Sequence, residues 1–177
     1  MARRTTVPNV SSQSQVRSES AAEPQSGSHP HAGVDDWNAD FMMAPTVRLA
    51  AAQRAVAAAL VEAERLAVDV CVAASDAGGH LLAFARMDRA PLLCGQIAQD
   101  KAFSVASFGG LPTGEWWRLL ESEPALLHGI VKTDRLIVFG GGVPLVSEGR
   151  TVGGIGVSGG SSEQDVRIAE AGAAVLS

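Results

Sequence analysis

The apolar and polar positions divide the chain into two stretches. Residues 1–40 are rich in Ser, Gln, Glu and Pro and show no apolar period. Such a segment buries too little surface to offset the entropy that it loses on ordering. From Thr46 onward, apolar residues recur at regular spacings, which is typical of packed helices and strands. We therefore expect a disordered tail over residues 1–40 and one folded domain over residues 41–177.

Within the folded stretch, the spacing of apolar residues predicts helices and strands in the order α-β-β-α-α-β-β-β-α. The predicted helices are Thr46–Ala67, Pro91–Phe108, Thr113–Glu121 and Ser162–Val175. The predicted strands are Val68–Ser75, His80–Ala85, Arg135–Phe139, Val143–Ser147 and Thr151–Ser158. Residues 124–134 are expected to be irregular. Hairpins dominate this order over parallel crossover units, which indicates an α/β (α+β) domain with an antiparallel sheet and packed helices.

Local signals mark the ends of these elements. Hydroxyl side chains that precede helices are predicted to cap them: Thr46, Thr113, and Ser161 or Ser162. Gly109-Gly110 is expected to stop the second helix, since glycine adopts the left-handed conformation that ends many helices. Asp76–Gly79 and Glu148-Gly149 are predicted to be the turns of two hairpins.

Composition and charge narrow the possible partners. The hydrophobic fraction is 46% but the aromatic fraction only 5%, so the core should consist mainly of Ala, Val, Leu and Ile. The net charge of −5 disfavours nucleic acid, because no basic face is available to displace its counterions. The chain contains no run of about eighteen consecutive apolar residues, so the sequence predicts no membrane-spanning helix. The basic start of the chain leads into Ser, Gln and Pro rather than an apolar stretch, so we expect no secretory signal and a cytoplasmic protein.

The two cysteines, Cys71 and Cys94, lack CxxC spacing and have apolar neighbours. We expect two free thiols rather than a disulfide or a metal pair. Trp116 and Trp117 are adjacent in a predicted helix, so they cannot both face one core. One of them is therefore expected to be exposed or to lie in an interface between subunits.

Lys101 is the most informative charged residue. On the predicted helix it shares an apolar stripe with Ile97, Val105 and Phe108. A lysine in such a stripe either extends its ammonium group to an edge or projects into a pocket where the charge is used. Burial would lower its pKa and suit it to act as an amine nucleophile or a carboxylate anchor.

Three further candidates lie on or beside the predicted strand His80–Ala85. His80 follows a glycine turn close to Asp76 and could be a metal or haem ligand or a proton carrier; a structural hydrogen-bonding role is the alternative. Arg86 could bind a carboxylate or a haem propionate with two parallel hydrogen bonds, with Asp88 orienting it. A surface ion pair is the alternative for Arg86 and Asp88.

The glycine-dense segment 153–160 lacks the contexts of nucleotide-binding motifs. It begins inside a strand and follows a hairpin, so it is not a strand–GxGxxG–helix unit, and the chain contains no GxxxxGK[ST]. The backbone amides around Ser158–Ser162 precede a helix and could hold an anion. A tight corner between strand and helix is the alternative, and the favoured one.

Four motifs follow one another in the order seen in a known family. They are Val72–Ala90, Asp100-Lys-Ala, Gly141-Gly-Val-Pro-Leu, and Val152–Gly160 followed by Glu163-Gln-Asp. Over about residues 45–177 the chain resembles the GlcG/HbpS-like family, also called domain of unknown function 336. This family includes the C-terminal domain of PduO-type cobalamin adenosyltransferases.

The resemblance implies a profilin-like fold with a central antiparallel sheet, assembled into a homo-oligomer, commonly a tetramer or octamer. Some members bind haem, and others are found among catabolic or biosynthetic genes. We therefore expect a small-molecule-binding protein with haem as the first candidate ligand. The alternatives are a cofactor-independent isomerase, lyase or hydrolase acting on a small carboxylate-bearing metabolite, and an oligomeric scaffold without chemistry.

The candidate residues fall into two groups. The catalytic candidates are Lys101, His80 and Asp76. The ligand-binding candidates are Arg86, Asp88, Thr113, Ser158 and Glu163. Whether the protein is an enzyme stays open on the sequence, and haem is the only cofactor that the resemblance suggests.

Overall fold

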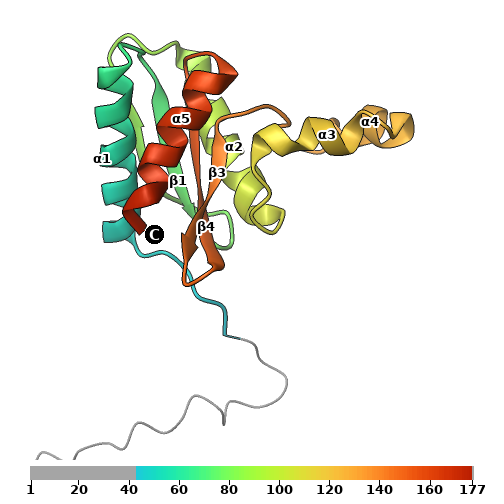
Figure 1. The fold of residues 1–177 in the computed structure, drawn as a ribbon, viewed down its shortest axis with the longest axis horizontal. Coiled ribbons are helices and arrows are strands. Elements are labelled where there is room, and N and C mark those ends of the chain that lie inside the picture. Colours follow the sequence, from blue (N-terminus) through green and yellow to red (C-terminus); the bar gives the residue numbers. More distant parts are fainter. Residues whose placement is uncertain (1–42, 177) are drawn as a thin grey trace, which may run out of the picture. The chain divides into compact units, whose positions relative to one another are not determined.

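A four-stranded antiparallel sheet forms the centre of the folded domain (Figure 1). The computed structural model describes residues 43–176, so the predicted tail over residues 1–40 lies outside the described part. The sheet has the order β2-β1-β4-β3. Its strands are β1 (Cys71–Asp76), β2 (Leu81–Arg86), β3 (Gly142–Ser147) and β4 (Arg150–Ser158). The predicted α+β class and antiparallel sheet are confirmed.

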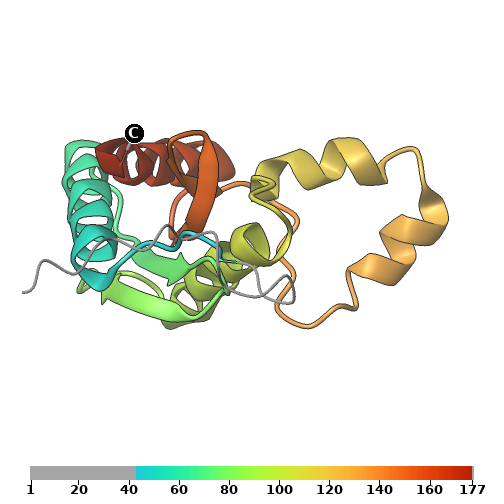
Figure 2. The ribbon, with the colours of Figure 1, turned by 90° about the horizontal axis from the view of Figure 1, so that it is seen from below.

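Helices cover both faces of this sheet (Figures 1 and 2). The α-helices are α1 (Leu49–Arg65), α2 (Leu92–Ser107), α3 (Trp116–Leu120), α4 (Pro124–Ile130) and α5 (Ser162–Ala173). Short 3-10 turns, η2 (Thr113–Glu115) and η3 (Ala174–Leu176), precede α3 and follow α5. The helices α1 and α5 pack on one face, and α2 packs on the other. No helix of the described residues is both long and apolar enough to cross a membrane.

The two faces of the sheet differ in the size of their side chains. Val72, Ile155 and Val157 are fully buried on the face toward α1 and α5, and burying such a side chain contributes roughly 1.5–3 kcal/mol. On the face toward α2, Ala73 pairs with Gly156 in neighbouring strands. A side chain at Gly156 would collide with the carbonyl oxygen of Ala98 in α2. Because the residues on this face are small, the backbone of α2 packs directly against β4.

Several predicted ends are observed. Gly109 has a φ of +65°, and the N–H of Gly110 donates to the carbonyl oxygen of Val105 at 2.9 Å, which together end α2 in a left-handed cap. Ser161 caps α5 in a reciprocal pair of hydrogen bonds with Gln164. In the β3–β4 turn, Glu148 and Gly149 both have positive φ, as a tight two-residue hairpin requires.

The predicted strand Arg135–Phe139 is wrong. Arg135 has a φ of 62°, which no strand residue adopts. The backbone of this segment is instead held by a side chain of α2. The hydroxyl of Ser104 accepts from the N–H of Ile137 at 2.9 Å, and its proton is shared between the carbonyl oxygens of Asp100 at 2.7 Å and Arg135 at 3.0 Å. These bonds replace the ladder that a fifth strand would have formed.

Three other predictions about local structure are also corrected. Residues 124–134 are not wholly irregular, because Pro124 begins helix α4 at its first position, where the missing N–H costs nothing. Thr46 caps no helix, since its hydroxyl accepts from the N–H of Ala77 at 3.0 Å and α1 begins after Arg48. Thr113 caps no helix either; its hydroxyl accepts from the N–H of Gly142 at 2.8 Å.

The helices α3 and α4 form an arm that projects from the rest of the domain (Figures 1 and 2). Trp116 anchors its base, with its ring 4.5 Å from that of Phe108. Trp117 is 57% exposed, so the prediction that the two tryptophans separate is confirmed. Leu120 of α3 is also buried, whereas no residue of α4 is, so only the α4 part of the arm stands clear of the core.

The close contact between α2 and β4 predicts a sharp difference between two glycines. Gly156→Ala should lower the free energy of unfolding by about 3 kcal/mol, because the new methyl group forces α2 away from the sheet. The control is Gly129→Ala in α4, where a Cβ meets nothing within 4 Å. This change should raise the free energy of unfolding by about 0.5 kcal/mol, because alanine has the higher helix propensity. Urea unfolding of both variants measures this difference, and equal stabilities would contradict the packing described.

Candidate functional site

Lys101 is fully enclosed between α2, β4 and α5, with none of its surface exposed. Its Nζ donates to Asp165 Oδ2 at 2.9 Å and to the carbonyl oxygen of Val157 at 2.7 Å. The Phe139 ring lies 4.9 Å from the ammonium group and closes the remaining side. Burial lowers the pKa of Lys101, and the carboxylate of Asp165 opposes that shift.

Asp165 completes this cluster from the first turn of α5. Its second oxygen, Oδ1, accepts from the N–H of Gly160 at 2.9 Å. The carboxylate therefore neutralises the ammonium group of Lys101 and the positive end of α5 at the same time. An external anion at the amides around Ser158–Ser162 was the less favoured interpretation of the sequence, and at Gly160 the negative charge is supplied by Asp165 of the chain itself.

The half-buried Asp76 and the exposed His80 form a pair at the turn between β1 and β2. The His80 Nδ1 lies 3.2 Å from both carboxylate oxygens of Asp76. Asp76 Oδ1 also accepts from the backbone N–H groups of Gly78 and His80, both at 2.9 Å. Partial burial raises the pKa of Asp76, but the hydrogen bonds from His80 and Gly78 outweigh it and hold this pKa below its usual range. The carboxylate therefore stays charged at neutral pH and fixes one ring nitrogen of His80.

The other ring nitrogen of His80 faces outward. The His80 side chain is 82% exposed, and no described residue bonds to its Nε2. When a carboxylate accepts the proton of Nδ1, the Nε2 of a neutral imidazole carries the free lone pair. A carboxylate–histidine pair of this kind is the usual arrangement behind a histidine that binds a metal.

A largely apolar pocket of about 320 Å³ lies beside this turn. Gly79, which precedes His80, packs against two of the pocket's lining residues, Phe103 and Ser107. Phe108 and Leu136 complete its apolar walls. The guanidinium group of Arg135 lies 3.9 Å above the Phe103 ring. A ring nitrogen, an apolar pocket and a cation are thus grouped at one end of the sheet.

Arg86 and Asp88 lie at the opposite end of β2. Arg86 Nη1 donates to the carbonyl oxygen of Ala90 at 2.8 Å. Both side chains line a pocket of about 330 Å³, in which Arg89 is paired with Asp69 at 3.0 Å. Asp88 makes no hydrogen bond to Arg86 within residues 43–176, so the orienting role expected for Asp88 is not seen in this arrangement.

The structure does not bring the candidate residues into one site. His80 and Arg86 are six residues apart along an extended segment, which at about 3.3 Å per residue separates their Cα atoms by about 20 Å. Lys101 is enclosed and contacts neither of them. Thr113 and Ser158 are buried, whereas Glu163 is exposed on the first turn of α5. The catalytic role of Lys101 stays a prediction, and its surroundings favour a structural role.

Sequence reasoning missed two residues of these clusters. Asp165 lies in the quoted Glu163-Gln-Asp motif, and its position in the first turn after the Ser161 cap was the available signal. Arg135 had no local signal, because its contact with Phe103 joins residues that are far apart in sequence. Cys71 and Cys94 are free thiols, the first buried and the second half-buried. No group of three potential metal ligands occurs within the described residues.

Comparison with known proteins identifies the class of protein. The family model described as "Haem degrading protein HbpS-like" matches residues 47–174, and the chain belongs to this family. It is 35% identical over 128 residues to an uncharacterised 15.0 kDa protein of Citrobacter freundii, covering 71% of this chain and 88% of that protein. It is 36% identical over 103 residues to the protein GlcG of Escherichia coli K12, covering 58% and 74%.

A longer relative and three solved structures extend this result. The corrinoid adenosyltransferase PduO of Citrobacter freundii is 35% identical over 122 residues, but the match covers only 36% of PduO and 67% of this chain. Klebsiella pneumoniae ORFY superposes with a TM-score of 0.73 at 33% identity, covering 79% of this chain and 97% of that chain. HbpS has a TM-score of 0.71 at 32% identity, covering 81% and 99%. The PduOC:haem complex has a TM-score of 0.67 at 30% identity, covering 74% and 95%.

The buried pair predicts that Lys101→Met destabilises the fold. This change leaves the carboxylate of Asp165 buried without its ammonium partner, which should cost about 3–5 kcal/mol. The double variant Lys101→Met, Asp165→Asn should recover much of the loss, since the amide still accepts from Gly160. Lys132→Met, at the other lysine, which is exposed, is the control. If urea unfolding gave Lys101→Met the stability of the unaltered protein, the structural role of the pair would be disproved.

Proposed function

We propose that the protein binds haem, with His80 Nε2 as the ligand to the iron. The observation that carries this proposal is the Asp76–His80 pair. The carboxylate holds Nδ1 at 3.2 Å and leaves Nε2 exposed and free to coordinate. A carboxylate partner fixes the orientation of the imidazole ring and increases its basicity, which suits an axial ligand of haem iron.

The surroundings of His80 fit the rest of such a ligand. The neighbouring pocket is lined mainly by apolar groups, including Phe103 and Phe108, and would receive part of a flat hydrophobic ring system. Among the described residues, Arg135 forms one side-chain hydrogen bond, from Nε to Asp100 at 2.9 Å, so other N–H groups of its guanidinium could bind a propionate. Arg86, at the far end of β2, is too distant to serve the same ligand within one subunit.

The similarity to known proteins also supports haem as the ligand. The family is described as haem-degrading and HbpS-like, and PduOC has been solved as a complex with haem. The haem itself would supply the iron chemistry. This chain's residues would bind and orient it: His80 at the iron, Asp76 behind His80, and the Phe103 wall against the ring.

Hemin titration of the purified full-length protein tests this proposal. We expect a saturable Soret shift with one haem per chain, and His80→Ala should weaken binding by more than tenfold. Asp76→Asn should weaken it less, because the amide still contacts the ring but no longer carries charge.

His128→Ala, in the arm, is the matched control and should leave the affinity unchanged. A second control replaces both His29 and His31 of the N-terminal segment. A non-saturating spectrum, or undiminished binding by His80→Ala, would contradict the proposal.

We also propose that the protein is a homo-oligomer, a tetramer or octamer. Leu92 and Leu93, at the start of α2, are 82% and 71% exposed, and Trp117 extends from the arm. Large apolar side chains gathered on exposed segments are typical of subunit interfaces. On α1, by contrast, Ala52, Ala55, Ala59 and Ala63 are buried within the subunit and so do not contribute.

Light scattering coupled to gel filtration should give a mass of four or eight 18.2 kDa chains at micromolar concentration. Leu93→Glu should shift the protein toward smaller species, because it places a charge beside the exposed Leu92 at the start of α2. Val61→Glu is the control, since Val61 is exposed on the outer side of α1. A single-chain mass for the unaltered protein would refute the oligomer.

A further inference from the structure

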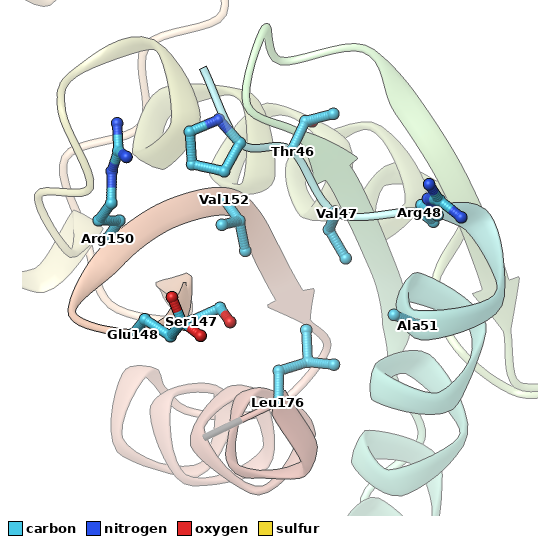
Figure 3. A pocket seen from close by; sticks show the side chains of 10 residues that line it. Thr46, Val47, Arg48, Ala51, Ser147, Glu148, Arg150, Val152 and Leu176 are labelled. Atoms are coloured by element: carbon cyan, nitrogen blue, oxygen red, sulfur yellow. The ribbon is translucent and has the colours of Figure 1, made fainter. Parts of the chain in front are cut away.

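A third pocket, of about 400 Å³, lies at one end of the sheet and is separate from the pocket beside His80 (Figure 3). The segment that precedes α1, the β3–β4 hairpin and the end of the chain surround it. Val47, Val152 and Leu176 extend toward the space between them (Figure 3). The pocket therefore has an apolar middle, and its volume is within the range of small-molecule sites.

Hydrogen bonds hold the walls of this pocket in place. The N–H of Val47 donates to the carbonyl oxygen of Val152 at 2.8 Å, which attaches the segment before α1 to the edge of β4. The hydroxyl of Thr46 accepts from the N–H of Ala77 at 3.0 Å, which attaches the same segment to the β1–β2 turn. The cavity is thus preformed, so a ligand pays little for ordering it.

Arg48 and Arg150 stand at opposite edges of the pocket (Figure 3). Neither guanidinium group forms a hydrogen bond or an ion pair within residues 43–176. Every other arginine of the described residues has a partner. Arginines in ion pairs are Arg65, Arg89, Arg118, Arg135 and Arg167, and those bonded to backbone carbonyls are Arg54 and Arg86. The two arginines without partners are the two that line this pocket.

The charge at Arg48 is also unfavourably placed. Arg48 is the N-cap residue of α1, which has neither a side-chain cap nor an acidic residue in its first turn. A cation next to the positive end of a helix raises the energy of the folded state. An anion bound between Arg48 and the pocket would relieve that repulsion.

We infer that this pocket binds an elongated dicarboxylate, with a carboxylate at each arginine and an apolar chain or ring across the middle. Guanidinium groups bind carboxylates through paired, charge-assisted hydrogen bonds. Glu148 also lines the pocket, and Figure 3 shows its side chain beside that of Ser147, below Arg150. Its carboxylate repels a negative charge placed against this wall, so the charged ends of a ligand should lie at the arginines. This site is independent of the haem proposed at His80.

Isothermal titration calorimetry of the full-length protein with linear dicarboxylates, from glutarate to sebacate, tests the inference. We expect saturable binding of one ligand per chain, with affinity passing through an optimum in chain length. Octanoate and the corresponding neutral diol should bind at least tenfold more weakly than suberate, because each lacks one or both charged ends. Absence of saturable binding across the series, or equal binding of suberate and octanoate, would overturn the inference.

Variants assign the binding to the pocket. Arg48→Gln and Arg150→Gln should each weaken binding of the best dicarboxylate about tenfold. Glu148→Gln should tighten it, because the change removes a nearby negative charge and keeps the shape of the side chain. Arg54→Gln, also on α1 but outside the pocket, is the control and should have no effect. Equal losses in Arg54→Gln and Arg48→Gln would overturn the assignment. His80→Ala should leave dicarboxylate binding unchanged, so this test and the haem test fail separately.

Discussion

The buried ion pair of Lys101 and Asp165 joins the elements that define this domain. It links α2, on one face of the sheet, to α5, on the other, past the end of β4. A desolvated pair of charges is tolerated only when each charge is fully bonded. Here the ammonium group also donates to Val157, and the carboxylate also accepts from Gly160 at the start of α5. Each charge is therefore held by more than its partner.

This arrangement depends on the glycines around it. Any Cβ at Gly141 would lie 2.6 Å from Lys101 Nζ, and one at Gly156 would lie 2.8 Å from Lys101 Cβ. Small residues on the α2 side of the sheet bring the stem of Lys101 close enough to reach across to α5. As a consequence, Lys101 is enclosed and a ligand cannot reach its ammonium group. Groups that a ligand can reach lie elsewhere, at the Asp76–His80 turn and between Arg48 and Arg150.

Local features of the sequence predicted much of this fold, and contacts between distant residues explain the misses. The hairpin turns, the Ser161 cap and the glycine stop after α2 depend on neighbouring residues and were found. Arg135–Phe139 has the composition of a strand, but Ser104 binds its backbone from more than thirty positions away. The apolar stripe around Lys101 marked this residue as a candidate, but its partner Asp165 lies 64 positions further along the chain. The periodicity of apolar residues within one helix cannot predict a contact between such distant positions.

The chemical accessibility of the two lysines tests the central claim most directly. Lys101 and Lys132 are the only lysines of the chain, and reductive methylation of the native protein followed by mass spectrometry reports on each. With Lys101 held by Asp165 and covered by Phe139, methylation should be rapid at the exposed Lys132 and nearly absent at Lys101 until the protein is unfolded. Methylation of both lysines at similar rates in the folded protein would contradict an enclosed, structural Lys101 and would return it to the candidates for chemistry.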